Sequence, residues 1–306
     1  MPDKPQYKAG FVTIVGKPNV GKSTLVNTLL SQKIAAVSPR PQTTRRRQLG
    51  ILTLENAQVI FMDTPGMHKP HHKLGDFMNA AAQETLADAD VIVFMVDAGQ
   101  APDAEDRLVA ERLAAFKPSP PQILAINKAD LPGSPDELAR REQAYRDLAP
   151  QAVPVTLSAA TGQSVHQLLE AILERLPAGE NFYDEGQVTD LYEREIAADL
   201  VREAALVHLR DEIPHAIAVR IDEYAERSAS QAYIAATIFV ERDSQKGIVI
   251  GQRGDMLKKI GSTARKEIET MSGRKIFLEL RVKVAKNWRN DESTLRSFGF
   301  SREGKE

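Results

Sequence analysis

The sequence predicts an α/β domain on a mostly parallel, doubly wound sheet, followed by a smaller α+β domain. Over the first 180 residues, short apolar runs alternate with helical patterns, as in parallel sheets covered by helices on both faces. A glycine-rich motif, residues 16–23, lies between the first apolar run and the first helical pattern. After residue 187 the pattern changes, and the last predicted strand alternates strictly between apolar and polar residues.

Composition supports two folded domains. The chain has 306 residues, of which 42% are hydrophobic and 27% charged, as is typical of soluble globular proteins. It has no cysteine, which excludes disulfides, thiolate zinc sites and cysteine nucleophiles. There is no run of about 20 apolar residues to cross a membrane. Met1–Lys8 is polar and lacks the apolar core of a signal peptide, so we expect a cytoplasmic protein.

The first domain is expected over residues 1–180. Its predicted strands are Phe11–Val15, Gln58–Met62, Val91–Val96, Gln122–Ile126 and Val153–Leu157. The helices predicted between them are Gly21–Leu30, Leu74–Ala87, Ala104–Phe116, Pro135–Leu148 and Val165–Leu176. An added strand, Gln48–Leu54, is expected to pair with Gln58–Met62 through a turn near residues 55–56.

A Pro-, Gly- and polar-rich stretch predicts a linker at residues 181–188, and the second domain is expected over residues 189–306. It opens with a helix over Asp190–Leu209, in which Glu193 is expected to serve as the capping partner. Strands are predicted over Ala216–Ala225, Ile234–Glu241 and Lys275–Ala285, with a mostly helical stretch over Gly247–Met271.

Residues 16–23, Gly-Lys-Pro-Asn-Val-Gly-Lys-Ser, fit the P-loop pattern G-x-x-x-x-G-K-S/T in its strand–loop–helix context. The glycines let successive backbone N–H groups point at phosphate oxygens, and the helix N-terminus adds its positive dipole end. Lys22 is expected to reach the β- and γ-phosphates, and Ser23 to ligate Mg²⁺. The predicted nucleotide contacts of this segment are Asn19, Val20, Gly21, Lys22, Ser23 and Thr24.

The base is predicted by residues 127–130, Asn-Lys-Ala-Asp, which follow a strand at the edge where open α/β sheets bind ligands. The carboxylate of Asp130 accepts hydrogen bonds from guanine N1–H and the exocyclic amine, whereas adenine leaves it unpaired. We therefore predict GTP and GDP as ligands, with Asn127 and Lys128 at the base. A backbone N–H of Ser158 or Ala159 is the predicted donor to the guanine oxygen.

The metal and the γ-phosphate are predicted to meet residues 63–66, Asp-Thr-Pro-Gly, a D-x-x-G pattern that follows a strand. Asp63 is expected to hold Mg²⁺ and the Gly66 N–H to bond the γ-phosphate. Upstream, Thr44 or Thr43 is positioned to complete the metal shell. The predicted metal ligands are Ser23, Thr44 and Asp63, and the predicted catalytic groups are Lys22, Thr44 and Gly66.

Together the segments GKPNVGKST, QTTR and DTPG resemble the Era group of translation-factor-related GTPases. The resemblance implies switch regions around Thr44 and Met67, and it favours Thr44 over Thr43 as the metal ligand. Met67 follows the D-x-x-G glycine, where Ras-like enzymes place a water-orienting glutamine, so slow intrinsic hydrolysis is expected. Asn19 resembles an asparagine that helps bind K⁺ in some relatives; the alternative is an Asn that caps the turn.

Positive charge is concentrated in the C-terminal fifth, which suggests that only this end meets a polyanion; the alternative is an ordinary solvated charged surface. From Lys246 to Glu306 there are 15 Lys and Arg against 8 Asp and Glu, although the whole chain has a net charge of −2. Here Gly251-Gln252-Arg253-Gly254 forms a G-x-x-G followed by a basic helical pattern. This arrangement resembles a KH domain of the prokaryotic, type II-like order, which clamps single-stranded nucleotides. The predicted RNA-binding residues are Gly251, Gln252, Arg253, Gly254, Lys258, Lys259, Lys283, Lys286 and Trp288.

Two interpretations of the basic end stay open. Trp288 either stacks on bases or packs the last strand onto its domain. The basic surface binds RNA or, as the alternative, anionic lipid in a membrane-associated regulatory GTPase without an RNA role. The Era resemblance implies the first: a GTPase that binds the 3′ end of 16S ribosomal RNA and acts in small-subunit assembly. We also expect a monomer, and peripheral membrane contact through the basic end stays a minor alternative.

Overall fold

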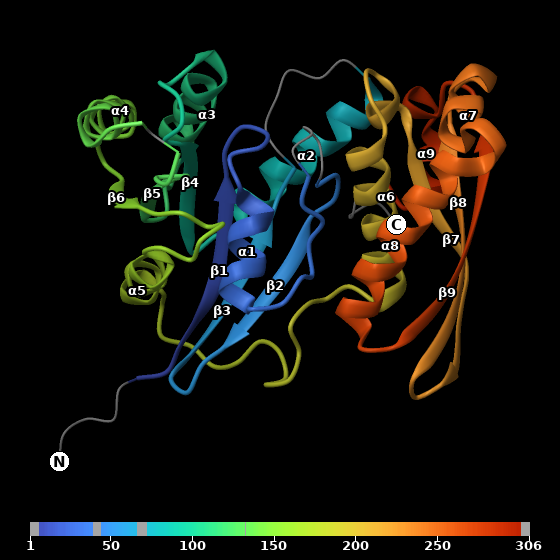
Figure 1. The fold of residues 1–306 in the computed structure, drawn as a ribbon. Helices are drawn as coiled ribbons and strands as arrows, with labels where there is room; N and C mark the ends of the chain where they lie inside the picture. Colours follow the sequence, from blue (N-terminus) through green and yellow to red (C-terminus); the bar gives the residue numbers. More distant parts are fainter. Residues whose placement is uncertain (1–5, 39–43, 66–71, 132, 301–306) are drawn as a thin grey trace. The chain divides into compact units, whose positions relative to one another are not determined.

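The computed structural model describes residues 6–38, 44–65, 72–131 and 133–300 (Figure 1). The chain divides into two compact units. The first contains residues 1–33, 44–69 and 78–190, and the second contains residues 34–43, 70–77 and 191–306. Each unit has its own sheet and hydrophobic core, and each is described separately below.

The first unit is built on a six-stranded sheet in the order β2-β3-β1-β4-β5-β6. Its strands are β1 (Lys8–Val15), β2 (Gln48–Thr53), β3 (Ala57–Asp63), β4 (Val91–Asp97), β5 (Gln122–Asn127) and β6 (Val153–Thr156). All neighbours are parallel except β2 and β3, which form the predicted antiparallel pair. The predicted fold class is confirmed, and the carboxyl ends of β1, β3 and β5 share one edge.

Helices cover both faces of this sheet, as the continuously apolar strands require. They are α1 (Lys22–Leu30), α2 (Lys73–Ala87), α3 (Ala104–Ala115), α4 (Pro135–Leu148) and α5 (Val165–Arg175). Ala82 of α2, Val109 of α3 and Tyr145 of α4 pack on one face in a core with Phe94 of β4. Helices α1 and α5 contact each other and the sheet. The sequence prediction placed all five helices within one residue of these bounds.

The predicted linker is hydrogen-bonded to strands β2 and β3 of the first unit. The side-chain oxygen of Gln58 accepts hydrogen bonds from the backbone N–H groups of Phe182 (2.8 Å) and Tyr183 (3.0 Å). The N–H of Ile51 donates to the Val188 carbonyl at 2.9 Å. The last of these contacts satisfies a backbone N–H of the edge strand β2 that would otherwise be open to pairing with another chain.

The prediction for the start of the next helix is wrong by one turn. Helix α6 begins at Glu193, and the N–H of its N-cap residue, Tyr192, donates to the carboxylate of Glu195 at 3.0 Å. Asp190, the expected first residue, instead accepts the N–H of Leu49 at 3.0 Å. A carboxylate used by the sheet edge cannot also cap the helix, so Glu195 takes the place that the sequence assigned to Glu193.

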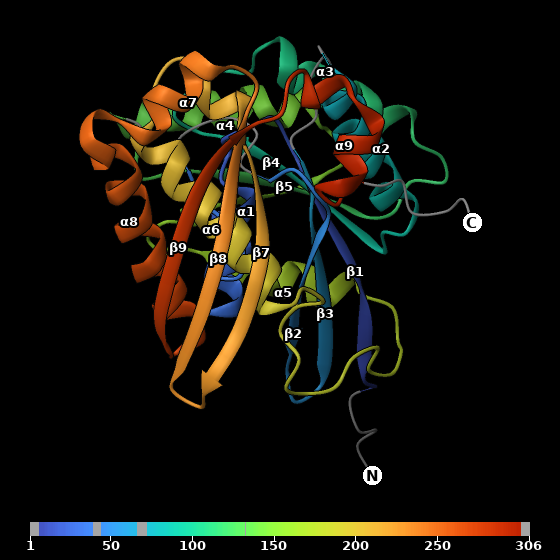
Figure 2. The ribbon, with the colours of Figure 1, turned by 90° about the vertical axis from the view of Figure 1, so that its right-hand side faces the viewer.

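The second unit has a three-stranded sheet in the order β7-β8-β9, with helices α6 and α8 on one of its faces (Figure 2). Its elements are α6 (Glu193–His208), β7 (Ala218–Ser228), β8 (Gln231–Val240), α7 (Asp243–Ile250), α8 (Asp255–Ser272), β9 (Lys275–Val284) and α9 (Glu292–Ser297). Strands β7 and β8 are antiparallel, and β8 and β9 are parallel. Ile260, Ala264 and Ile268 of α8 pack against Ile276 and Val282 of β9 in the core.

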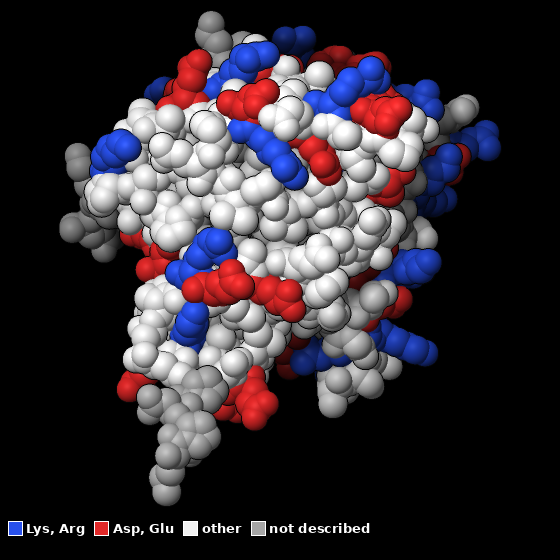
Figure 3. All heavy atoms as spheres, turned by 90° about the vertical axis from the view of Figure 1, so that its left-hand side faces the viewer, with Lys and Arg blue, Asp and Glu red and all other residues white. Residues whose placement is uncertain are grey.

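No helix among the described residues is long and apolar enough to span a bilayer. The face of the molecule drawn in Figure 3 carries Lys and Arg interspersed with Asp and Glu. Mixed charge of this kind is typical of a solvated surface.

Candidate nucleotide and RNA sites

The phosphate loop connects β1 to α1, and its glycines have no room for side chains. Gly21 has a φ of 106°, and a Cβ there would lie 2.4 Å from the side-chain nitrogen of Asn127. Any other residue at this position would push the base motif away from the loop. The loop therefore approaches β5 closely enough for the phosphate and base motifs to contact each other.

Lys22, the motif lysine, is buried beneath the loop. Its Nζ donates to the carbonyl oxygens of Gly16 (3.1 Å) and Lys17 (3.0 Å). Burial lowers the pKa of Lys22 to about 8, although the negative charge of Asp63 acts to raise it. The lysine is thus held at the loop by two carbonyls, which phosphate oxygens can replace as stronger, charged acceptors.

The three predicted metal ligands lie together. The Ser23 hydroxyl donates to Asp63 Oδ2 at 2.6 Å, and the Thr44 hydroxyl lies 2.8 Å from Ser23 Oγ and 3.2 Å from the same carboxylate oxygen. Thr43, the alternative to Thr44, is outside the described residues, as are Gly66 and Met67. The structure therefore supports Thr44 for the metal shell and leaves the predicted roles of Gly66 and Met67 as predictions.

These donors fit Mg²⁺. Asp63 is fully buried, and burial raises the pKa of its carboxyl group although hydroxyls bond to it. Its second oxygen, Oδ1, is buried without a hydrogen-bond partner among the described residues. A buried carboxylate with a spare oxygen beside two hydroxyls offers the hard oxygen ligands that Mg²⁺ prefers. The described residues contain no group of three His, Cys, Asp or Glu that could hold a metal by itself.

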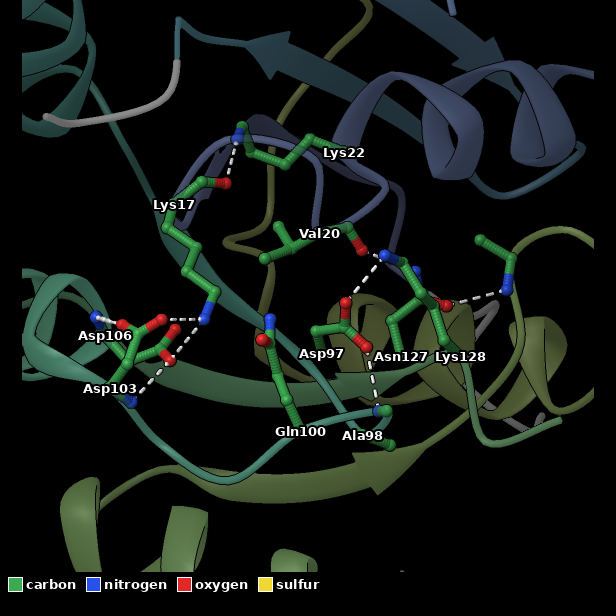
Figure 4. A network of polar contacts seen from close by, with 12 residues as sticks. Lys17, Val20, Lys22, Asp97, Ala98, Gln100, Asp103, Asp106, Asn127 and Lys128 are labelled. Carbon is green, nitrogen blue, oxygen red and sulfur yellow. Dashed lines mark hydrogen bonds and ion pairs between the residues drawn. The ribbon is translucent and has the colours of Figure 1, made fainter. Parts of the chain in front are cut away.

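The base motif lies at the end of β5. Asn127 donates from Nδ2 to the Val20 carbonyl at 2.7 Å, and its Oδ1 accepts the N–H of Ala159 at 2.8 Å. Lys128 pairs with Asp97 at 2.7 Å. Asp130 is exposed, as a residue that reads a ligand base must be. The structure therefore joins Asn127 to the phosphate loop, with Lys128 next to it (Figure 4), and Asp130 follows two residues later in the chain.

The predicted donor to the guanine oxygen has a partner in this structure. Ser158 N–H donates to the Gln163 carbonyl at 3.0 Å, and Ala159 N–H donates to Asn127. Either group must exchange its acceptor before it can serve guanine. Thr24, the last predicted contact of the phosphate loop, lies in the first turn of α1, where its carbonyl accepts the Thr28 hydroxyl at 2.9 Å.

Several polar residues behind the nucleotide site were not predicted as part of it: Lys17, Asp97, Asp103, Asp106 and Tyr145. Lys17 pairs with Asp103 and Asp106, and Asp97 pairs with Lys128 (Figure 4). The Tyr145 hydroxyl lies 3.5 Å from Asp106 Oδ2 and 3.2 Å from the backbone oxygen of Asp97, so it lies between the two pairs. The available signal was that Asp97 ends a strand, next to the two strands that end in motifs. To use this signal one must know the strand order β1-β4-β5, in which β4 lies between the two motif-bearing strands. No local sequence pattern reveals that order.

In the second unit, the G-x-x-G loop lies between α7 and α8, as the KH resemblance implied. A Cβ on Gly251 would lie 2.7 Å from the backbone nitrogen of Met256, so this glycine is needed for the turn itself. Gly254 has a φ of 82°, but nothing lies within 4 Å of a Cβ built there. The open space at Gly254 leaves room for a sugar–phosphate backbone to approach the loop.

The predicted RNA-binding side chains fall into two groups. Gln252, Arg253, Lys258 and Lys259 are exposed at the loop and the first turns of α8. Lys283 is exposed on β9, on the strand face opposite the one that packs in the core, and Lys286 is exposed beyond its end. Only the first group adjoins the G-x-x-G loop. Successive side chains of a strand point to opposite faces of the sheet, so Lys283 points away from the helices.

The stacking interpretation of Trp288 is wrong for this structure. The indole is fully buried, and its Nε1–H donates to the Ala216 carbonyl at 2.9 Å. Its ring packs edge-on against Phe298, with the centroids 5.6 Å apart. A ring enclosed in this way cannot stack on a base. The alternative interpretation, packing of the last strand onto the domain, is the one that the structure supports.

Comparisons with known proteins match both halves. The family described as 50S ribosome-binding GTPase matches residues 11–128, and the KH domain family matches residues 212–289. Era in complex with MgGDPNP and nucleotides 1506–1542 of 16S ribosomal RNA is 40% identical, with a TM-score of 0.91 over 97% of this chain and 100% of that one. A variant of Aquifex aeolicus Era bound to GDP and AlF4⁻ is also 40% identical, with a TM-score of 0.91 over 96% of this chain and 100% of that one.

Proposed function

The chain belongs to the Era family of GTPases, and on that premise we propose that it binds the 3′ end of 16S ribosomal RNA and acts in assembly of the small ribosomal subunit. The observation that carries the proposal is the pairing of two sites in one chain. The Ser23–Thr44–Asp63 cluster beside a guanine-reading motif forms one site, and an open G-x-x-G loop with basic neighbours forms the other.

Hydrolysis in this site is attack of water on the γ-phosphate, which yields GDP and phosphate. Ser23, Thr44 and Asp63 would hold Mg²⁺, which would supply positive charge to stabilise the phosphate oxygens. Lys22 moves its hydrogen bonds from loop carbonyls to phosphate oxygens and stabilises the charge that develops in the transition state. Asp130 binds the base and thereby fixes the position of the phosphates relative to Lys22 and the metal site.

The RNA site is proposed to clamp a short single strand. The backbone of Gly254 lets the strand approach, while Arg253, Lys258 and Lys259 meet its phosphates. The hydrolysis of GTP is proposed to time RNA release, which requires the two nucleotide states to differ in RNA affinity. A regulatory GTPase without an RNA role, the other interpretation of the sequence, is not favoured because a KH domain accompanies the GTPase domain.

Three finer points belong to the same proposal. We propose that the protein is a cytoplasmic monomer, that it makes at most peripheral contact with membranes, and that Asn19 helps to bind K⁺ beside the phosphates. The basic C-terminal region is the feature that supports contact with an anionic lipid surface. Sedimentation gives the mass in solution, and turnover compared in K⁺ and Na⁺ buffers tests the role of Asn19.

The test is binding of an RNA oligonucleotide that matches the 3′ end of 16S RNA, with a scrambled oligonucleotide and one from large-subunit RNA as controls. Measurements at about 50 mM and about 200 mM salt separate specific binding from phosphate attraction. Binding that prefers the matching RNA at both salt concentrations supports the proposal. Equal binding of all three RNAs, falling steeply with salt, contradicts it.

A further inference from the structure

The phosphate loop carries a second lysine, Lys17, whose side chain turns away from the ligand side. Its Nζ lies 2.6 Å from Asp103 Oδ2 and 2.8 Å from Asp106 Oδ2, and its side chain is only 5% exposed (Figure 4). Although burial by itself would lower the pKa of Lys17, the two carboxylates raise it above its ordinary value. Lys17 is therefore a charged group held by α3, and it is not available to meet phosphate.

The two carboxylates are themselves fixed by the N-terminus of α3. Asp103 caps the helix by accepting the N–H groups of Glu105 (2.9 Å) and Asp106 (3.1 Å). Asp106 accepts the N–H of Asp103 at 3.1 Å and is fully buried. A capping box of this kind has little freedom to move. The lysine therefore attaches the phosphate loop to a rigid helix end.

The same helix end leads to the base motif. The Tyr145 hydroxyl lies 3.5 Å from Asp106 Oδ2 and 3.2 Å from the backbone oxygen of Asp97. The Asp97 carboxylate then holds Lys128 at 2.7 Å and the Gly99 N–H at 2.8 Å. One chain of buried and partly buried contacts thus runs from Lys17 in the phosphate loop to Lys128 in the base motif.

We propose that Lys17 is a positioning residue for nucleotide binding: its ion pairs with Asp103 and Asp106 hold the phosphate loop in the conformation that binds the phosphates. The loop carbonyl of Lys17 is one of the two acceptors of Lys22, so displacement of Lys17 also displaces the acceptor of the phosphate-binding lysine. The proposal rests on the nucleotide site described above and adds a support that touches no ligand atom.

The test must separate positioning from folding, because Lys17→Met leaves Asp106 as an unpaired buried charge, which destabilises a protein strongly. The double variant Lys17→Met with Asp106→Asn removes that charge. Lys17→Arg keeps the ion pair, and Leu113→Ala, on the buried face of the same helix, is a control that destabilises α3 away from the network. For each variant, GDP affinity and the thermal midpoint are measured, with the wild-type protein as the reference.

We expect Lys17→Met to weaken GDP binding by about tenfold or more, and Lys17→Arg to restore it to within about threefold. The double variant should regain thermal stability while its GDP affinity stays low. Leu113→Ala should lose stability and keep its GDP affinity. If the double variant regains both properties, or if Lys17→Met binds GDP as the wild type does, the positioning role is overturned. Failure of the wild type to bind GDP would instead contradict the nucleotide site.

Discussion

The side-chain amide of Asn127 donates a 2.7 Å hydrogen bond to the backbone oxygen of Val20 and thereby joins the base motif to the phosphate loop. The two residues are 107 positions apart in the chain and come from different strand ends. Because the amide oxygen also holds the Ala159 N–H, Asn127 connects three loops. Its role in the free protein is to fix the site before nucleotide arrives, which reduces the ordering cost of binding.

Asn127→Ala should therefore weaken GDP and GTP-analogue binding to a similar degree. The substitution removes two buried hydrogen bonds and leaves the Ala159 N–H unpaired, so the free energy of nucleotide binding should become less favourable by about 1–3 kcal/mol. Calorimetric titration with both ligands measures the effect. A loss confined to one ligand would show that Asn127 acts in a nucleotide-dependent step and not in assembly of the site.

The depressed pKa of Lys22, about 8, predicts a pH dependence of nucleotide affinity. Phosphate binds the protonated lysine, so above pH 8 the free protein must take up a proton on binding, and the Kd should rise by up to about tenfold per pH unit. Below pH 8 the lysine is already charged and the Kd should be flat with respect to this group.

Equilibrium titration with GDP from about pH 7 to about pH 9 tests the Lys22 prediction. Lys22→Met is the control. It should bind weakly and lack the added slope, whereas ionisation of guanine itself would appear in both proteins. A wild-type Kd that does not change across this range would contradict a lysine that loses its charge near pH 8.

Asp63→Asn should abolish Mg²⁺-dependent GTP binding but stabilise the nucleotide-free protein. The folded-state pKa of Asp63 is raised, so ionisation near neutral pH costs more in the folded chain than in the unfolded one. The amide removes this penalty, so the variant should unfold at a higher temperature than the wild type at neutral pH. The gain should shrink as pH falls through the raised pKa, because the wild-type carboxyl then protonates.

Thermal melts of Asp63→Asn and wild type at several pH values, without nucleotide, test this account. Asp136→Asn, an exposed carboxylate in the first turn of α4, is the matched control and should show no such gain. A lower midpoint for Asp63→Asn at neutral pH would mean that the ionised carboxylate stabilises the empty site.

Asp130→Asn should change the base that the site accepts. The carboxylate accepts from guanine N1–H and the exocyclic amine, and loss of that match should cost GDP about 2–3 kcal/mol or more. An asparagine amide can accept from N1–H and donate to a carbonyl at C2, which is the pattern of xanthine. Competition between GDP and xanthosine diphosphate measures the switch. Retained preference for GDP would place Asp130 away from the base edge.

Gly254→Asp should remove RNA binding and leave GDP binding intact. The substitution places a negative side chain in the open space at the G-x-x-G loop and forces a non-glycine residue to a φ of 82°. Gly273→Asp is a matched control, since Gly273 also has a positive φ, at 66°, and open space around it, but it lies at the other end of α8. Equal loss of RNA binding in both variants would point to a folding defect.

Much of the fold follows from local pattern. The helix over residues 135–148 was predicted within its observed bounds, because Pro135 at the first position follows a capping serine, Ser134, that bonds the N–H of Glu137. The start of α6 was mispredicted because Asp190 is used by Leu49, 141 positions away. Local rules cannot anticipate a capping residue that has a distant competitor.

The nucleotide site divides in the same way. Ser23, Asp63 and Asn127 stand in motifs whose spacing reflects ligand geometry, so sequence identified them. Lys17 and Asp106 have no motif, since their partnership depends on where α3 begins relative to β1. For Trp288, its position among basic residues suggested RNA, but the hydrogen bond to Ala216 shows that burial decides its role.

RNA affinity in the two nucleotide states tests the central claim most directly. One oligonucleotide matching the 3′ end of 16S RNA would be titrated with protein saturated by GDP, and again by a non-hydrolysable GTP analogue, at constant salt. Gly254→Asp would be titrated beside it. The account predicts tighter binding in the analogue state and none in the variant. Equal affinity in both states would contradict a nucleotide-timed RNA-binding protein.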